Sequence, residues 1–155
     1  MRVSYQAALA LGLILAASAA QAIESKASKI STDSVDAVWT KIGDFCGIAQ
    51  WHPAIANCVL SADKKDRTLT LKGGGTIVEH LVRWSDKMHS YTYKIVSGPL
   101  PVENYESTIH VAKSGSGSVI RWKGKYTAKA PASDADAKKA IDGVYDSGLT
   151  ALAGG

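Results

Sequence analysis

The chain has 155 residues, the length of one domain, and its 46% hydrophobic and 21% charged residues are typical of a globular protein. This composition excludes disordered and fibrous classes. The formal net charge is +4, from 18 basic and 14 acidic side chains, but no run of basic residues is present. The scattered charge excludes a basic arm of the kind that binds nucleic acid.

Residues 1–22 are predicted to be a signal peptide. Arg2 precedes a run of small and apolar residues that ends in Ala-Gln-Ala, the small-x-small pattern that signal peptidase cleaves. The run is shorter than the roughly 20 residues of a membrane-spanning helix, and the alternative is an uncleaved anchor. We expect cleavage after Ala22, a periplasmic or secreted protein with no membrane span once the signal is removed, and a single domain over residues 23–155.

The two cysteines, Cys46 and Cys58, are 12 positions apart. In an oxidising compartment such a pair can form a disulfide, and the alternative is two buried thiols that pack as small hydrophobic groups. No CxxC or HxxxH spacing is present, so no metal site is expected. The sequence also lacks nucleotide motifs, and we expect no cofactor.

The expected elements begin with a strand over residues 23–30. Ser31, Thr32 and Asp33 are good N-cap residues for a short amphipathic helix that ends near Gly43, and residues 45–53 follow as a second short helix or a structured turn. Turn residues then separate six predicted strands, at 55–62, 67–72, 76–84, 89–97, 103–113 and 117–128. The short connections favour an antiparallel sheet.

The last predicted element is a helix over residues 135–153 with a single apolar stripe. Its stripe consists of Ala137, Ile141, Val144, Tyr145, Gly148, Leu149 and Leu152. A curved antiparallel sheet needs cover on one face, and this stripe can supply it. We therefore predict an α+β fold in which the sheet wraps around the C-terminal helix.

Strand 117–128 has the clearest two-sided pattern. Arg121, Lys123 and Lys125 share one face, so the alternate residues, which include Trp122 and Tyr126, face the core. The basic face is either simply solvated or a surface that attracts an acidic protein partner.

Strand 76–84 is ambiguous from its pattern alone. If Ile77, Glu79 and Leu81 face inward, Glu79 is a buried carboxylate, which is costly unless paired or protonated and is therefore a site candidate. If the other face is inward, Glu79 and Arg83 form a solvated pair. A third possibility is a buried structural pair of Glu79 with Arg83.

Several stretches resemble the bacterial SRPBCC, or polyketide cyclase/dehydrase-like, family over about residues 30–153. These are Val38-Trp39, Ile42-Gly43-Asp44-Phe45, Trp51-His52-Pro53-Ala54-Ile55, Arg67-Thr68-Leu69-Thr70-Leu71, Gly75-Thr76-Ile77-Val78-Glu79, Ser90-Tyr91-Thr92-Tyr93 and Gly98-Pro99-Leu100-Pro101-Val102. The resemblance implies a START-like helix-grip fold, with seven antiparallel strands around a long C-terminal helix and two short helices after the first strand. The resemblance is to the exported bacterial subset of the family, which looks like proteins placed near methanol-oxidation systems in some bacteria.

The resemblance further implies a cavity between sheet and helix for an apolar or aromatic, lipid- or polyketide-like molecule, with Glu79 on the concave side. The expected ligand-binding residues are Trp51, His52, Glu79, Tyr91, Tyr93, Tyr105, Trp122 and Tyr126. The aromatic members either line this cavity or simply fill the core. Residues 98–101, with two prolines, are either a loop over the entrance or a rigid connector.

Glu79 and His52 are also the catalytic candidates. A carboxyl of raised pKa beside tyrosine hydroxyls suits enolisation or dehydration, and the alternatives are ligand orientation or a structural role. His52 is either an acid/base at the cavity mouth or a side chain that satisfies a backbone carbonyl.

Three functions remain open at this stage. The favoured one is an exported protein that binds a small molecule without turnover. The second is a cyclase/dehydratase-type enzyme that uses Glu79 with His52 or a tyrosine. The third is a periplasmic accessory protein that docks through its basic face on a partner such as a dehydrogenase.

Overall fold

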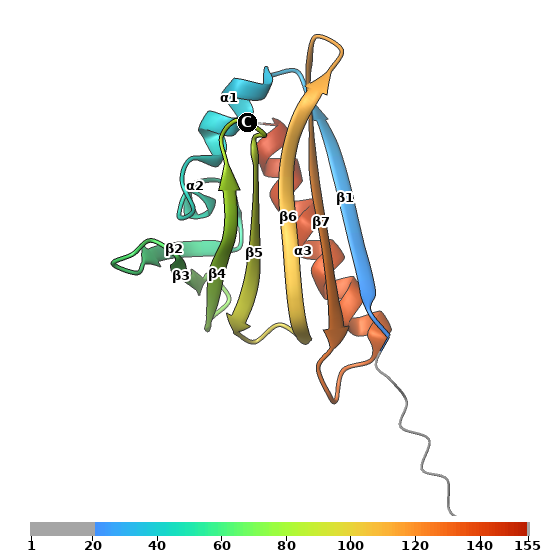
Figure 1. Ribbon diagram of the computed structural model, residues 1–155. Coiled ribbons are helices and arrows are strands. Elements are labelled where there is room, and N and C mark those ends of the chain that lie inside the picture. The colour runs from blue at the N-terminus through green and yellow to red at the C-terminus, as the bar shows by residue number, and fades with distance from the viewer. Residues whose placement is uncertain (1–20, 155) are drawn as a thin grey trace, which may run out of the picture.

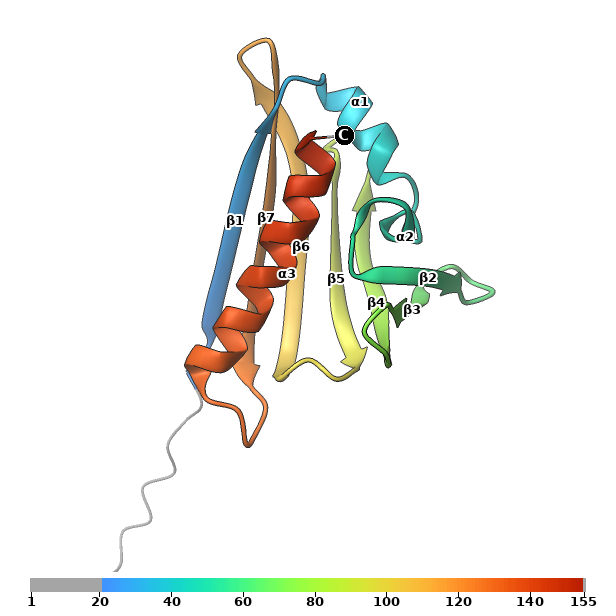
Figure 2. The same ribbon diagram turned by 180° about the vertical axis from the view of Figure 1, so that it is seen from behind.

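The computed structural model describes residues 21–154, so nearly all of the predicted signal peptide lies outside the described residues. The fold is one seven-stranded sheet that curves around a long helix (Figures 1 and 2). In chain order the elements are β1 (Ile23–Ser31), α1 (Val35–Ile42), α2 (Ile48–Trp51), β2 (Ile55–Leu60), β3 (Asp66–Leu71), β4 (Thr76–Ser85), β5 (Ser90–Ser97), β6 (Val102–Ser114), β7 (Gly117–Ala128) and α3 (Asp134–Gly154). The predicted α+β helix-grip fold is confirmed.

All neighbouring strands in the sheet are antiparallel, in the order β1-β7-β6-β5-β4-β3-β2. Strands β2 and β3 turn away from the direction of the other five, and α3 runs along the inner side of the curved sheet (Figure 2). The interior between α3 and the β2–β5 half of the sheet is the place where a ligand site can form.

The helix starts follow local capping chemistry. Ser34, rather than one of the three residues before it, caps α1, because its hydroxyl accepts a hydrogen bond from the Ala37 N–H at 3.2 Å. In the same way the Ser133 hydroxyl accepts from the Asp136 N–H at the start of α3. The N-cap of α1 was therefore predicted wrongly, since it lies one residue after the predicted Ser31, Thr32 and Asp33.

The α3 stripe packs against the sheet largely as predicted. Ala137, Ile141, Tyr145 and Leu149 are buried, whereas Val144 is only half-buried at the edge of the stripe. The outer face of β7 carries its exposed basic residues, and its alternate residues are buried. Alternation in this strand predicted both faces, because a sheet with one solvated face imposes a strict two-residue period.

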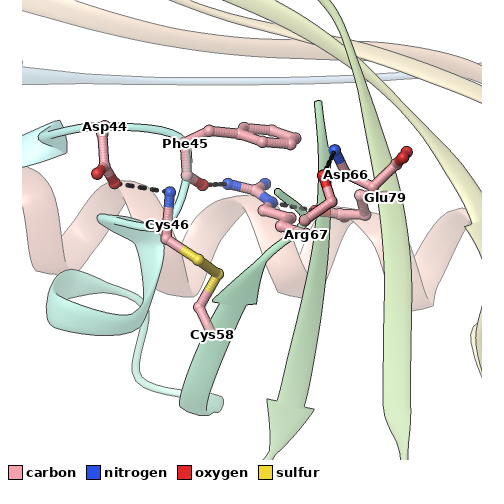
Figure 3. The surroundings of a disulfide bond; sticks show 8 residues. Asp44, Phe45, Cys46, Cys58, Asp66, Arg67 and Glu79 are labelled. Atoms are coloured by element: carbon pink, nitrogen blue, oxygen red, sulfur yellow. Dashed lines mark hydrogen bonds and ion pairs between the residues drawn. A yellow bond between two sulfur atoms is a disulfide. The ribbon is translucent and has the colours of Figure 1, made fainter. Parts of the chain in front are cut away.

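A disulfide joins Cys46, which precedes α2, to Cys58 on β2, with 5.5 Å between the two Cα atoms (Figure 3). The segment it closes contains α2 and the turn into β2, and therefore holds Ile48, His52 and Ile55 against the interior. This bridge fixes one wall of the site described next.

Candidate functional site: an apolar cavity between sheet and helix

A cavity of about 160 Å³ lies between α3, α2 and strands β2 to β7. Most of its wall is aliphatic, and Leu69, Ile77 and Ile141 are buried members of it. Ala54, Leu71, Ile95, Leu100 and Val144 also border the cavity and are partly or fully exposed. The polar side chains at the wall are Glu79, His52, Tyr93 and Tyr105, together with the indole of Trp122.

Glu79 faces inward, and its partner is Arg67. The two residues lie directly opposite each other on β4 and β3, and Arg67 Nε donates to Glu79 Oε2 at 2.6 Å. Arg67 is 1% exposed and Glu79 is 4% exposed, whereas Arg83 is exposed. Both predicted pairings of Glu79 with Arg83 are therefore wrong, because Arg83 lies on the outer face of β4.

The Arg67 guanidinium is enclosed on several sides. Its Nη1 donates to the Phe45 carbonyl, and its Cζ lies 4.0 Å from the centre of the Phe45 ring, where a cation–π attraction acts (Figure 3). Sequence reasoning missed Arg67 as a site residue. The available signal was the alternation of Arg67, Leu69 and Leu71, because it places the arginine on the same inward face as the two leucines.

The charges of this pair are set by burial and by each other. Burial raises the pKa of the Glu79 carboxyl above its usual range, and the adjacent guanidinium opposes part of that rise. Burial lowers the pKa of Arg67, but Glu79, with smaller contributions from Tyr91 and Tyr93, more than compensates, so the net pKa of Arg67 is raised and it stays protonated. Because Oε2 is held by Arg67, the Glu79 carboxyl is a fixed polar point on an otherwise apolar wall.

Beyond Glu79, a chain of hydroxyls crosses from the sheet to the helix. The hydroxyls of Tyr93 and Tyr105 are 3.2 Å apart, and those of Tyr105 and Tyr145 are 2.7 Å apart. Tyr145 donates to Ser107 Oγ at 3.0 Å, which also accepts from the Trp122 indole N–H at 2.8 Å. Burial raises the pKa of all three tyrosines, so they are neutral hydrogen-bonding groups.

Two glycines make room for these contacts. A Cβ on Gly124 would collide with the Tyr145 hydroxyl, and a Cβ on Gly148 would lie 2.7 Å from His52 Cδ2 and 2.8 Å from Trp122 Cζ3. The spacing of apolar residues places Tyr145 and Gly148 on the helix stripe. It does not show which side chain of the sheet each of them contacts.

His52 is buried, and backbone groups occupy both of its ring nitrogens. Nδ1 accepts from the Ala54 N–H at 3.2 Å, which assigns the proton to Nε2, and Nε2 lies 3.1 Å from the Val144 carbonyl oxygen of α3. Burial lowers the pKa of His52, so the neutral ring is favoured. Of the two roles considered for His52, this geometry matches the satisfaction of a backbone carbonyl.

The remaining predicted residues lie outside the cavity wall. Trp51 packs against His52 and Trp122, Tyr91 stacks on Trp84 with ring centres 5.0 Å apart, and the Tyr126 hydroxyl lies 2.5 Å from Ser25 Oγ. The structure thus brings His52, Glu79, Tyr93, Tyr105 and Trp122 to one cavity and places the other three around it.

Residues 21–154 contain no cluster of three His, Cys, Asp or Glu side chains placed to hold a metal ion. Within the same residues, no helix is both long enough and apolar enough to cross a membrane.

Residues 22–154 match the family described as polyketide cyclase / dehydrase and lipid transport, so the chain belongs to that family. No functionally curated protein matches the chain.

Solved structures with the same fold extend over most of the chain. The protein XoxI from Bacillus cereus is 35% identical, with a TM-score of 0.81 over 84% of this chain and 93% of its own. An uncharacterised protein from Bacillus thuringiensis is 36% identical, with a TM-score of 0.82 over 85% of this chain and 97% of its own.

The Zhui aromatase/cyclase from Streptomyces sp. R1128 is 11% identical, with a TM-score of 0.73 over 86% of this chain and 93% of its own. At this identity the likeness concerns the fold alone. The family and the helix-grip fold fit a ligand-binding or cyclase-like protein.

Proposed function

We propose that the protein binds a small apolar or aromatic molecule in the cavity between sheet and α3 and does not transform it. One observation carries the proposal: the wall of the cavity is almost entirely apolar, and its few polar groups are already held in place by the protein. Such a wall desolvates an apolar ligand, and fixed polar points orient it.

The size of the cavity narrows the ligand class. Ligand pockets for drug-sized molecules usually have about 300–1,000 Å³, whereas an engineered apolar cavity of about 150 Å³ in another protein binds benzene. The 160 Å³ found here supports a single ring or a short branched chain as the buried part of the ligand. A full lipid or polyketide chain requires more room than this cavity offers.

The contacts of Glu79 and His52 favour binding over catalysis. A general base must reach the proton that it removes, but Arg67 holds Glu79 Oε2 at 2.6 Å and shares its charge. The two nitrogens of His52 are already occupied by backbone groups. An enzyme that used His52 would first have to break these backbone contacts, and one that used Glu79 would act beside the Arg67 charge, which makes the carboxylate a weaker base.

A titration with 4-fluorotoluene, followed by ¹⁹F NMR, tests the proposal. We expect saturable binding that Ile77→Phe abolishes, because the larger side chain fills the cavity. Val59→Phe is the matched control, since it adds the same ring to an exposed position of β2. Failure to bind, or equal binding to the Ile77→Phe protein, would contradict the proposal.

Whether the ligand is transformed needs a separate measurement. Small molecules extracted from natively purified protein would be returned to fresh protein and followed by mass spectrometry. Recovery of the unchanged molecule supports binding alone. Product formation that Glu79→Gln abolishes while the fold is retained would instead establish the enzyme.

A further inference from the structure

Strands β5 and β6 separate before they end. Their pairing runs from Ser90 opposite His110 to Lys94 opposite Glu106, but β5 continues to Ser97 and β6 already begins at Val102. The two ribbons are visibly apart at this end of the sheet (Figure 1). The sheet is therefore split next to the cavity.

The β6 backbone is irregular beside the split. Its register with β7 shifts between Glu103 and Glu106, and Asn104 has a φ of 53° in the left-handed region, which non-glycine residues seldom adopt. Bulges of this kind bend a strand and re-aim its side chains. Here the bend carries the start of β6 away from β5.

A groove of about 590 Å³ occupies the split. Ile95, Leu100 and Tyr105 border both this groove and the interior cavity. Because the two spaces share these residues and the pairing of β5 with β6 ends at Lys94 and Glu106, no paired backbone of these two strands closes the sheet between them. We propose that groove and cavity together form one binding site for an amphipathic molecule with an uncharged polar end.

The residues that line the two spaces indicate which end of the molecule each space binds. The cavity takes the apolar end, as the proposed function requires, and this inference rests on that function. The groove is bordered by polar side chains, two basic and two acidic, together with an amide: Lys94, Lys129, Glu103, Glu106 and Asn104. Lys94 Nζ is 3.4 Å from Glu106 Oε2, so the groove favours neither a cation nor an anion.

Leu100 is the residue that separates the two spaces on the connecting loop. The loop backbone is anchored, since the Val102 N–H donates to the Leu100 carbonyl at 2.8 Å and the Lys129 N–H donates to the Pro101 carbonyl at 3.0 Å. Gly98 packs closely on Ile77 of the cavity wall, where an added Cβ would lie 3.1 Å from Ile77 Cγ1. With the backbone held, the half-buried Leu100 side chain lies at the junction of cavity and groove.

Three fluorinated probes with a common ring test this inference by ¹⁹F NMR. 4-Fluorotoluene occupies the cavity alone, 1-fluoro-4-propylbenzene adds an apolar chain, and 3-(4-fluorophenyl)propan-1-ol adds a chain of the same length that ends in a hydroxyl. We expect the alcohol to bind at least fivefold tighter than the propyl compound. The carboxylate 3-(4-fluorophenyl)propanoate should bind no tighter than the alcohol.

Leu100→Trp tests whether the two spaces communicate. A larger side chain at the junction should remove the advantage of the alcohol, so that the alcohol and the propyl compound bind this variant within about twofold of each other. Because Leu100 also borders the cavity, this ratio of two affinities, and not the affinity for 4-fluorotoluene, is the readout. Val59→Trp, on the exposed face of β2, should leave all affinities unchanged.

Two results would overturn the inference that groove and cavity form one site, but would not contradict the proposed function. One is equal binding of the alcohol and the propyl compound, and the other is an advantage of the alcohol that survives in the Leu100→Trp protein. If 4-fluorotoluene also fails to bind, the proposed function falls and this inference falls with it.

Discussion

Arg67 Nε and Glu79 Oε2 form a 2.6 Å ion pair inside the core, and the two residues belong to neighbouring strands at directly opposed positions. Both side chains are almost completely removed from solvent. Removing charges from water is expensive, and a buried pair is tolerated only where each partner compensates the other. The loss of either residue should therefore leave an uncompensated charge in the cavity wall.

Arg67→Met should destabilise the protein by about 3–5 kcal/mol, because it leaves the Glu79 carboxyl buried without a cation and the Phe45 carbonyl without its donor. Urea unfolding measures this loss. Glu79→Gln should cost less, since an amide oxygen still accepts from Arg67.

The double variant Arg67→Met/Glu79→Leu is the decisive comparison. With both charges removed it should recover most of the stability lost in Arg67→Met, because no uncompensated charge remains in the core. Glu79→Leu alone completes the comparison. If the double variant loses as much stability as Arg67→Met and Glu79→Leu lose together when measured singly, the residues act independently and the pair is not the unit described here.

How much of this site the sequence predicts depends on the kind of signal. Alternation in β7 predicted the inward faces of Trp122 and Tyr126, since a strand with one solvated face has a strict period of two. The same rule also places Arg67 inward, but a lone arginine in a strand is usually taken as exposed. Glu79, 12 positions further on, compensates the buried charge of Arg67. The sequence alone does not show the strand register that brings the two residues together.

The helix shows the same limit. Periodicity identified the apolar stripe of α3, which includes Tyr145 and Gly148. It did not indicate that the Tyr145 hydroxyl joins the Tyr105 and Ser107 hydroxyls, or that Gly148 faces His52. These contacts depend on how far along the sheet the helix lies, and no local pattern encodes that distance.

The disulfide should stabilise the cavity wall as well as the fold. A closed loop of this length contributes roughly 3 kcal/mol by restricting the unfolded chain, so Cys46→Ala/Cys58→Ala should lower the free energy of unfolding by about that amount. Because the loop carries Ile48 and His52, hydrogen exchange should also increase in residues 47–57 before global unfolding.

Urea denaturation of the oxidised protein and of the double-alanine variant measures the effect of the bridge. Mass spectrometry verifies the bridge, since the oxidised protein should gain 2 Da on reduction. Equal stability of the two proteins, with unchanged exchange in this segment, would show that packing alone holds the wall.

Two glycines of α3 should respond in opposite ways to alanine. Gly143 is exposed, and an added Cβ meets nothing within 4 Å, so Gly143→Ala should stabilise the protein by up to about 1 kcal/mol through helix propensity. Gly148→Ala should destabilise it by about 1–3 kcal/mol, because the new methyl collides with the rings of His52 and Trp122.

Thermal or urea unfolding of both variants makes this a matched comparison on one helix. A stabilising Gly148→Ala would mean that α3 shifts freely on the sheet, and the close contact of helix and His52 would not be a constraint of the fold.

His52 should make stability fall as the pH falls below about 7. Its pKa is lowered in the folded protein by burial, so in the window between the folded pKa and the unfolded pKa of about 6.5 the unfolded chain binds a proton that the folded protein excludes. The free energy of unfolding therefore rises with pH in this window, by at most about 1.4 kcal/mol per pH unit for one proton. His110, whose pKa is also lowered by burial, adds a change of the same sign.

Urea titrations at pH 5, 6 and 7 separate the two histidines. His52→Gln should lose stability at pH 7, since the contacts with Ala54 and Val144 are disturbed, and should show a flatter dependence on pH than the wild type. His110→Gln, on the outer face of β6, should keep more of the slope because its ring is less buried. If the His52→Gln protein has the same slope as the wild type, His52 binds its proton equally in the folded and the unfolded states, and burial does not lower its pKa.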